Sequence, residues 1–152
     1  MPAKVKVGIV ALCDAVYKDE GSNKVIIAGL YSGDIITEGT PHDMRFALYA
    51  EVFPPDTLKH VMDIQFWFGG KQLGGVKAEI TSPVVGQSTA LMLQQFPLVG
   101  DLPAKLELKM VWDGGRPVTI LSKQVSLRSA PTASPPPRAR SPRAARAKAS
   151  KS

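Results

Sequence analysis

The chain has 152 residues, of which 44% are hydrophobic and 21% are charged, values typical of a globular protein rather than of a disordered one. Its formal net charge is +6, and no apolar run approaches the roughly 18 residues that a membrane helix needs. We therefore expect one domain of ordinary size with a single hydrophobic core and no contact with a membrane.

The first expected element is a long β-hairpin over residues 5–37. Two apolar-rich runs, 5–16 and 24–36, flank the turn-forming sequence Asp19-Glu20-Gly21-Ser22-Asn23. Each run becomes apolar on both strand faces, which is typical of strands that are covered on both sides of a sheet. The hairpin is thus expected to be the scaffold of a layered β fold, with Cys13, Ile9 and Ile27 buried in it.

The rest of the chain alternates between apolar and polar residues in short runs separated by Gly and Pro. The strands expected from this pattern are 42–53, 58–68, 76–81, 89–96, 105–112 and 116–128. About eight strands without helical periodicity predict an all-β fold, a two-layer antiparallel β-sandwich with Greek-key-like connections that spans residues 1–128.

Several details of this sandwich follow from the same pattern. The strands 42–53 and 58–68 are expected to pair with each other, and the Gly-rich segment 69–75 is expected to be a flexible connection. Asp113-Gly114-Gly115 predicts a hairpin turn before the last strand. A change in the apolar phase of that strand predicts a bulge near Ser122.

Residues 129–152 differ in composition from the rest of the chain. They carry no acidic residue and six basic ones, Arg138, Arg140, Arg143, Arg146, Lys148 and Lys151. The other 13 basic residues equal the 13 acidic residues, so the segment 1–128 is formally neutral. We expect a disordered Pro/Ala/Arg-rich basic tail. One possible role of this tail is contact with an acidic partner or, non-specifically, with nucleic acid, and the alternative is that it only makes the protein more soluble.

The N-terminus and the single cysteine favour a cytoplasmic location. The apolar stretch from Gly8 to Cys13 is shorter than the roughly 7–15 residues of a secretory signal core, and Asp14 ends it. Cys13 is the only cysteine, so an internal disulfide is excluded and a reducing compartment is expected.

No motif predicts catalysis, a metal or a cofactor. His42 and His60 have no further ligand at zinc-binding spacing, and both are expected to be surface or turn residues. No serine lies in a Gly-x-Ser-x-Gly motif. The loop around Lys71 has neither the order of a phosphate-binding loop nor a helix after it.

Asp14 and Asp34 are the unusual acidic residues of the predicted hairpin, and perturbed acids gather at functional sites. Pairing about the predicted turn places Asp14 opposite Ala28 or Gly29, however, and not opposite Asp34. An acid/base or cation-binding pair is therefore not expected.

Tyr49 and Trp67 fall on the polar sides of their predicted strands. If the two rings are contiguous and exposed, they form an aromatic patch of the kind that marks a protein partner or self-association surface. The alternative is that a loop covers them.

Cys13-Asp14, followed by the run from Asn23 to Ile35, resembles the start of a family of small bacterial proteins of unknown function. In that family a Cys-Asp or similar pair leads into a strand that begins with Gly-Lys and ends in a Gly-Val-Tyr-like sequence. The resemblance covers roughly the first 50 residues, and this chain has Asn23-Lys24 where Gly-Lys is usual. It implies a bacterial, cytoplasmic, non-enzymatic all-β protein and supplies no catalytic residue.

The sequence therefore predicts a non-enzymatic binding or structural module. Two alternatives remain open, a small hydrolase-type enzyme with a site built from loops, and a phage or particle component that assembles through edge strands. An enzyme needs a concave site that gathers polar groups with perturbed pKa values, whereas a binding module of the expected kind presents a flat apolar patch near Tyr49 and Trp67.

Overall fold

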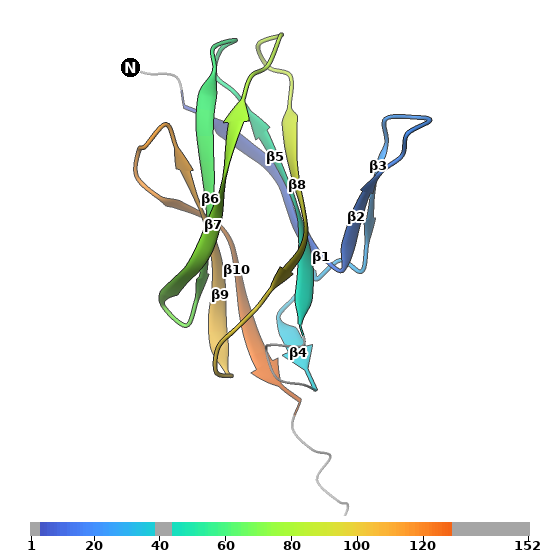
Figure 1. Ribbon diagram of the computed structural model, residues 1–152, viewed down its shortest axis with the longest axis vertical. Coiled ribbons are helices and arrows are strands. Elements are labelled where there is room, and N and C mark those ends of the chain that lie inside the picture. The colour runs from blue at the N-terminus through green and yellow to red at the C-terminus, as the bar shows by residue number, and fades with distance from the viewer. Residues whose placement is uncertain (1–3, 39–43, 129–152) are drawn as a thin grey trace, which may run out of the picture.

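The computed structural model describes residues 4–38 and 44–128, and within them it contains ten strands and no helix (Figure 1). The predicted all-β fold is confirmed. The strands are β1 (Lys6–Cys13), β2 (Ala15–Lys18), β3 (Val25–Ala28), β4 (Ile35–Thr37), β5 (Arg45–Phe53), β6 (His60–Phe68), β7 (Lys71–Ile80), β8 (Thr89–Pro97), β9 (Ala104–Trp112) and β10 (Val118–Leu127).

The strands form two facing sheets and a separate hairpin. One sheet has the order β1-β5-β8, the other has the order β4-β10-β9-β6-β7, and β2 pairs with β3 beside them (Figure 1). Every pair is antiparallel except β4 with β10, which is parallel. The chain passes from one sheet to the other between β5 and β6, between β7 and β8, and between β8 and β9.

The core lies between the two sheets and is built mainly by β5 and β6. Their inward side chains alternate along each strand as predicted and are all buried, namely Phe46, Leu48, Ala50 and Val52 on β5 and Met62, Ile64, Phe66 and Phe68 on β6. Fully burying a large apolar side chain contributes about 1.5–3 kcal/mol. The prediction that these two strands pair is wrong, because β5 bonds to β1 and β8 whereas β6 bonds to β7 and β9.

The segment 5–37 does not form one long hairpin as predicted. The chain divides at Asp14, whose backbone N–H donates to the carbonyl oxygens of Ala28 and Gly29, at 3.1 Å each. The part before Asp14 is β1, which pairs with β5, and the part after it is the short β2–β3 hairpin. The predicted position of Asp14 opposite Ala28 or Gly29 is confirmed.

The hairpin covers the outer face of the three-stranded sheet. Cys13 is fully buried, as predicted, in a small cluster with Val16 and Ala47, against which the half-buried Ile27 packs. Ile9 was expected in the core but is 59% exposed. The pairing of β1 with β5 shifts between Val7 and Val10, and this bulge leaves Ile9 on the outside.

Two further details differ from expectation. The chain turns at Gly69 and Gly70 alone, and residues 71–75 are already part of β7 and pair with β6, so they are not a flexible connection. The bulge of β10 falls between Thr119 and Leu121, slightly before the predicted position at Ser122. The turn after Trp112 forms where the Asp-Gly sequence predicts it.

Residues 30–37, here called the strap, join the edges of the two sheets. The N–H of Tyr31 donates to the carbonyl oxygen of Leu12 on β1, at 2.9 Å. A carboxylate oxygen of Asp34 accepts the N–H of Gln124 on β10, at 3.0 Å, and β4 then pairs with the end of β10. The strap therefore closes one half of the gap between β1 and β10, here called the β1–β10 seam. The other half, nearer the β5–β6 and β9–β10 connections, is here called the upper seam, and no strand of the described residues covers it.

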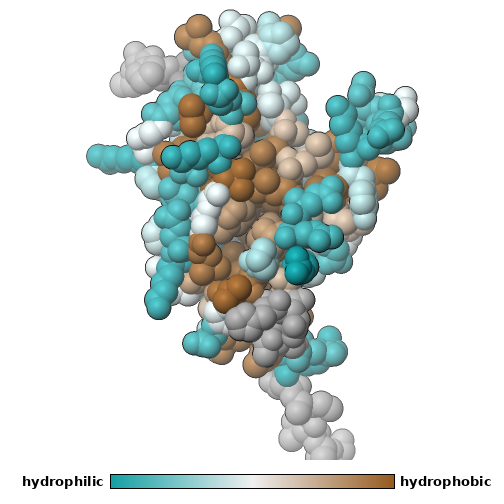
Figure 2. Space-filling view, viewed as in Figure 1, coloured by the Kyte–Doolittle hydropathy of each residue, from teal (hydrophilic) through white to brown (hydrophobic). Residues whose placement is uncertain are grey.

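The opposite side of the sandwich lies between the edge strands β7 and β8. Figure 2 shows apolar side chains along the middle of this face, with hydrophilic ones on both sides of them. A small cavity of about 190 Å³ opens there, lined by Phe66, Leu73, Gly74, Phe96, Pro97 and Leu98.

Gly29 lies at the point where the hairpin leads into the strap. Its φ is +67°, and a Cβ added there would lie 2.0 Å from a carboxylate oxygen of Asp14. We expect Gly29→Ala to lower the free energy of unfolding by about 1–3 kcal/mol, as measured by urea denaturation. Gly33→Ala is the matched control, because no atom lies within 4 Å of a Cβ there; equal losses in the two variants would contradict this account.

Candidate functional site

A large cavity lies at the upper seam, between the two sheets. Its volume is about 800 Å³. The apolar part of its wall comes from β1 and its approach, from β9 and β10, and from the loop after β5, namely Val5, Val7, Pro55, Met110, Trp112 and Val118. Asp56, His60 and Asp113 form a polar group at one end of this wall.

His60 is the first residue of β6 and is held between two carboxylates. Its Nδ1 lies 2.6 Å from a carboxylate oxygen of Asp113, and its Nε2 lies 2.9 Å from a carboxylate oxygen of Asp56. The ring packs on Trp112, with 4.8 Å between ring centroids. His60 is therefore not the surface or turn residue that its sequence predicted, because its side chain is only 9% exposed.

The two carboxylates are themselves fixed by backbone groups. Asp113 accepts the N–H of Val61, at 2.8 Å, and its own N–H donates to the carbonyl oxygen of Val61, at 2.9 Å. Asp56 accepts the N–H of Leu58, at 2.8 Å. The Asp56–His60–Asp113 cluster thus ties together the β5–β6 loop, the start of β6 and the β9–β10 turn.

This arrangement favours the charged forms of all three groups. The hydrogen bond that His60 donates to Asp113 is the main reason that the pKa of His60 is raised. The backbone N–H of Val61 and then His60 lower the pKa of Asp113, and the backbone N–H of Leu58 and then His60 lower the pKa of Asp56. An imidazolium that donates to two carboxylates is therefore the preferred state.

The chemistry available to this cluster is limited by its hydrogen bonds. A general base needs a free nitrogen lone pair within reach of the proton that it removes, and both ring nitrogens of His60 already face carboxylates. No serine, threonine or cysteine is among the residues that line the cavity. In residues 4–38 and 44–128 no group of three His, Cys, Asp or Glu side chains is arranged to hold a metal ion.

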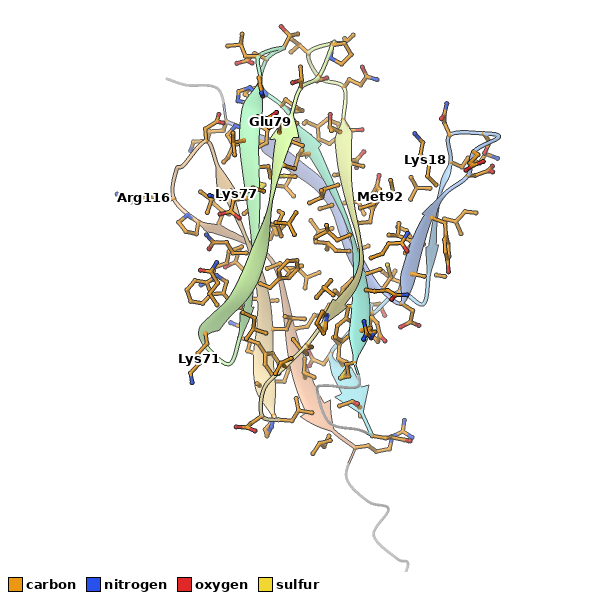
Figure 3. The ribbon with its side chains drawn as sticks, viewed as in Figure 1. Lys18, Lys71, Lys77, Glu79, Met92 and Arg116 are labelled. Atoms are coloured by element: carbon orange, nitrogen blue, oxygen red, sulfur yellow. The ribbon has the colours of Figure 1, made fainter. Side chains whose placement is uncertain are left out.

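Two cations stand at the same cavity. Lys4 and Arg116 line it and are exposed, and Figure 3 shows Arg116 extending outward from the β9–β10 turn. Within the described part of the chain neither has an ion-pair partner. An anionic group of a ligand can therefore be neutralised here without breaking an existing pair.

The predicted aromatic residues lie on different sheets and do not meet. Tyr49 is on the outer face of β5, half-buried beneath the β2–β3 hairpin, where burial raises its pKa. Its pairing partner Met92 points to the same hairpin (Figure 3). For Tyr49 the structure therefore corresponds to the alternative in which another segment covers the ring.

Trp67 lies on the outer face of the five-stranded sheet. Its indole N–H donates to the side-chain oxygen of Gln65, at 3.2 Å, and the Nζ of Lys109 lies 4.2 Å from the centroid of its ring. Trp67 is half-buried among these polar neighbours rather than part of a flat apolar patch. A partner surface at either aromatic residue stays a prediction.

The other residues singled out in the sequence have local structural partners. Asp14 accepts the hydroxyl of Tyr31, at 2.6 Å, and burial followed by this bond raises the pKa of Tyr31 to about 12. Asp34 bonds to Gln124 and not to Asp14. Burial raises the pKa of the Cys13 thiol, which is the opposite of what a reactive cysteine needs. His42 and the six basic residues of the predicted tail lie outside the described residues.

The Asp56–His60–Asp113 cluster was missed in the sequence because its members are far apart along the chain, with 53 positions between the bonded residues His60 and Asp113. One local signal was present. Asp56 lies four residues before His60, directly ahead of a strand, and the strong turn sequence supplies Asp113. Only the pairing of β6 with β9 brings that turn beside His60.

Comparison with known proteins adds no assignment. No family model matches the chain, and no curated protein is significantly similar to it in sequence. The resemblance of the N-terminal region to a bacterial family therefore stays a prediction. In the described residues no helix is long and apolar enough to span a membrane.

The pH dependence of stability tests the charge state of His60. The raised pKa of His60 stabilises the fold fully below pH 6.5, and this stabilisation is lost as the pH rises through the raised value. The lowered pKa values of Asp56 and Asp113 stabilise the fold above pH 3.8, and this stabilisation is lost as the pH falls through the lowered values. We expect His60→Gln to cost about 1–3 kcal/mol in the free energy of unfolding, with the largest loss between these two pH values.

Urea denaturation of the wild type and the variant across this range is the measurement. Lys59→Gln is the control, because Lys59 is a neighbouring exposed residue whose ion pair is with the exposed Glu79. A difference between wild type and His60→Gln that stays constant from acid to alkaline pH would contradict the charged state proposed for the cluster.

Proposed function

We propose that the protein is a non-enzymatic binding module and that the cavity at the upper seam is its binding site. The observation that carries the proposal is the combination of an apolar cavity of about 800 Å³ with one fixed polar cluster and two rim cations, Lys4 and Arg116, that have no ion-pair partner among the described residues. Ligand sites typically have this composition, with mostly apolar walls and a few positioned polar groups.

The hydrolase alternative has less support. It requires a nucleophile activated by a base that is itself oriented by a third group. His60 has the orienting carboxylates, but a second carboxylate occupies the ring nitrogen that would face the nucleophile. The cluster acts instead as a rigid wall that keeps the β9–β10 turn in place beside the cavity.

Binding of the neutral apolar dye Nile red tests the proposed site. We expect the wild type to bind the dye with a rise in its fluorescence and with energy transfer from the nearby Trp112. Val118→Trp places a large side chain at a cavity residue that is 56% exposed, so the fold can tolerate it and the dye is excluded. We expect a loss of affinity of at least about tenfold, or about 1.4 kcal/mol.

Val85→Trp is the matched control. Val85 is 62% exposed and lies in the β7–β8 loop, away from the cavity. Equal dye binding by the wild type and by both tryptophan variants would show that the dye binds elsewhere, and the proposed site would then be wrong.

The basic tail is proposed as an accessory contact with nucleic acid or an acidic partner. The support is the charge distribution, because the excess of positive charge belongs entirely to residues 129–152. Phosphate contacts made by lysine and arginine weaken steeply with added salt. The tail has no aromatic residue for base stacking, so this contact would not depend on base sequence.

Replacement of all six basic tail residues by glutamine in the full chain tests this contact. We expect the wild type to bind a fluorescent duplex of mixed sequence at low salt, with an affinity that falls as salt is raised, and the variant to lose most of both the affinity and the salt dependence. Fluorescence anisotropy at several salt concentrations is the measurement. Identical salt dependence in the two proteins would remove the tail from this role.

A further inference from the structure

The cavity lies between two free strand edges, and this placement bears on what fills it. In the part of the chain that the structure describes, β1 pairs with β5 on one side only, and β10 has β4 on its outer side only at residues 125–127. Within that part, the residues of β10 from Val118 to Gln124 pair with β9 alone. An uncovered edge of this kind presents backbone donors and acceptors to whatever enters the seam.

The orientation of these backbone groups can be read from Gln124. Its N–H points away from β9, because it donates to the side chain of Asp34 in the strap. Backbone groups alternate in direction along a strand, so the N–H of Ser122 points to the same free edge. Ser122 is exposed and pairs with Glu107 on its other side.

The strap shows how this edge receives an extended segment. β4 lies along the end of β10 with Ile35 only 1% exposed in the core, while the next residue, Ile36, is 62% exposed. Alternate side chains thus point inward and outward, as in any strand added to a sheet edge. The cavity is the continuation of this arrangement above β4, where no segment of the described chain occupies the edge.

The charges at the rim of the cavity restrict which charge a ligand can carry. Asp56 and Asp113 both bond to His60 and to backbone N–H groups, so the acidic side of the rim is internally satisfied. Among the described residues at the rim, Lys4 and Arg116 are the charges without an ion-pair partner and are therefore left for a ligand. A ligand with a carboxylate therefore fits better than a neutral or cationic one.

We infer that the ligand is an extended polypeptide segment of a partner protein, which adds to the free edge of β10 in line with β4, places alternate apolar side chains in the cavity and directs an acidic group to Lys4 and Arg116. This inference rests on the function proposed above. Strand addition to an exposed edge is a general mode of peptide recognition, in which backbone hydrogen bonds supply affinity and pockets for alternate side chains supply specificity.

A random twelve-residue peptide library displayed on phage, selected against the full chain, tests the inference. We expect the selected peptides to alternate apolar with polar residues, to carry an acidic residue and to displace Nile red. Lys4→Glu combined with Arg116→Glu should weaken the peptides about tenfold and leave binding of the neutral dye unchanged, whereas Val118→Trp should weaken both.

Backbone pairing is tested separately from apolar contact. N-methylation of every second peptide residue removes backbone donors, and it can be placed on either of the two alternating sets of residues. The peptide methylated on the set that faces β10 should lose at least about tenfold in affinity. Ser122→Pro, which removes an outward N–H from β10, should do the same without affecting Nile red. Hydrogen exchange of the backbone amides in residues 118–124 should slow when peptide is bound.

The outcomes separate the two proposals. If Nile red does not bind at Val118, the proposed function fails and the inference fails with it. If the dye binds there but no selected peptide displaces it, or N-methylated peptides bind as well as unmodified ones, the inference is wrong while the cavity remains a binding site. Displacement of the dye by raised concentrations of the protein itself would assign the edge to a second copy of the chain and would also overturn the inference.

Discussion

The packing of β5 against β6 is the constraint on which the rest of the structure depends. Each strand has one fully apolar face, and Leu48 and Ile64 within those faces are completely buried in one shared cluster. Two strands that are adjacent in the chain would ordinarily pair, but pairing would leave both apolar faces on the same side of a single sheet. Placing them in opposite sheets lets each face cover the other. The remaining strands then extend the two sheets from β5 and β6.

The sequence predicted the parts of this structure that depend on local pattern. Alternation located β5, β6, β8 and β9 to within a few residues, and the Asp-Gly sequence located the β9–β10 turn. The features that the sequence did not predict depend on which strand pairs with which. The apolar run 5–16 is equally suited to a long hairpin and to a strand that leaves at Cys13 for another sheet, and only the bonds of the Asp14 N–H to Ala28 and Gly29 decide between them.

The candidate site was hidden for a related reason. A histidine at a strand start is ordinarily a surface residue, and nothing in the residues around His60 indicates burial. Its environment is built by Trp112 and Asp113, which arrive from a turn that becomes adjacent only when β9 pairs with β6. The cavity next to it lies beyond the point where the strap stops along β10, which is set by the pairing of β4 with residues 125–127. Properties of this kind are set by tertiary structure, and residue spacing carries little information about them.

The parallel pairing of β4 with β10 has a consequence for the order in which the protein assembles. β4 ends at Thr37, whereas the residues with which it pairs, Val125 to Leu127, lie at the end of the last strand of the described chain. During synthesis on the ribosome, the three-stranded sheet and the core between β5 and β6 have their residues long before β10 emerges. The strap must therefore wait without its partner strand until β10 has been synthesised, and the closing of the seam is expected to be a late, long-range step of folding. Until then the apolar Ile35 is without its place in the core, so the nascent chain exposes at this edge the kind of surface that chaperones bind.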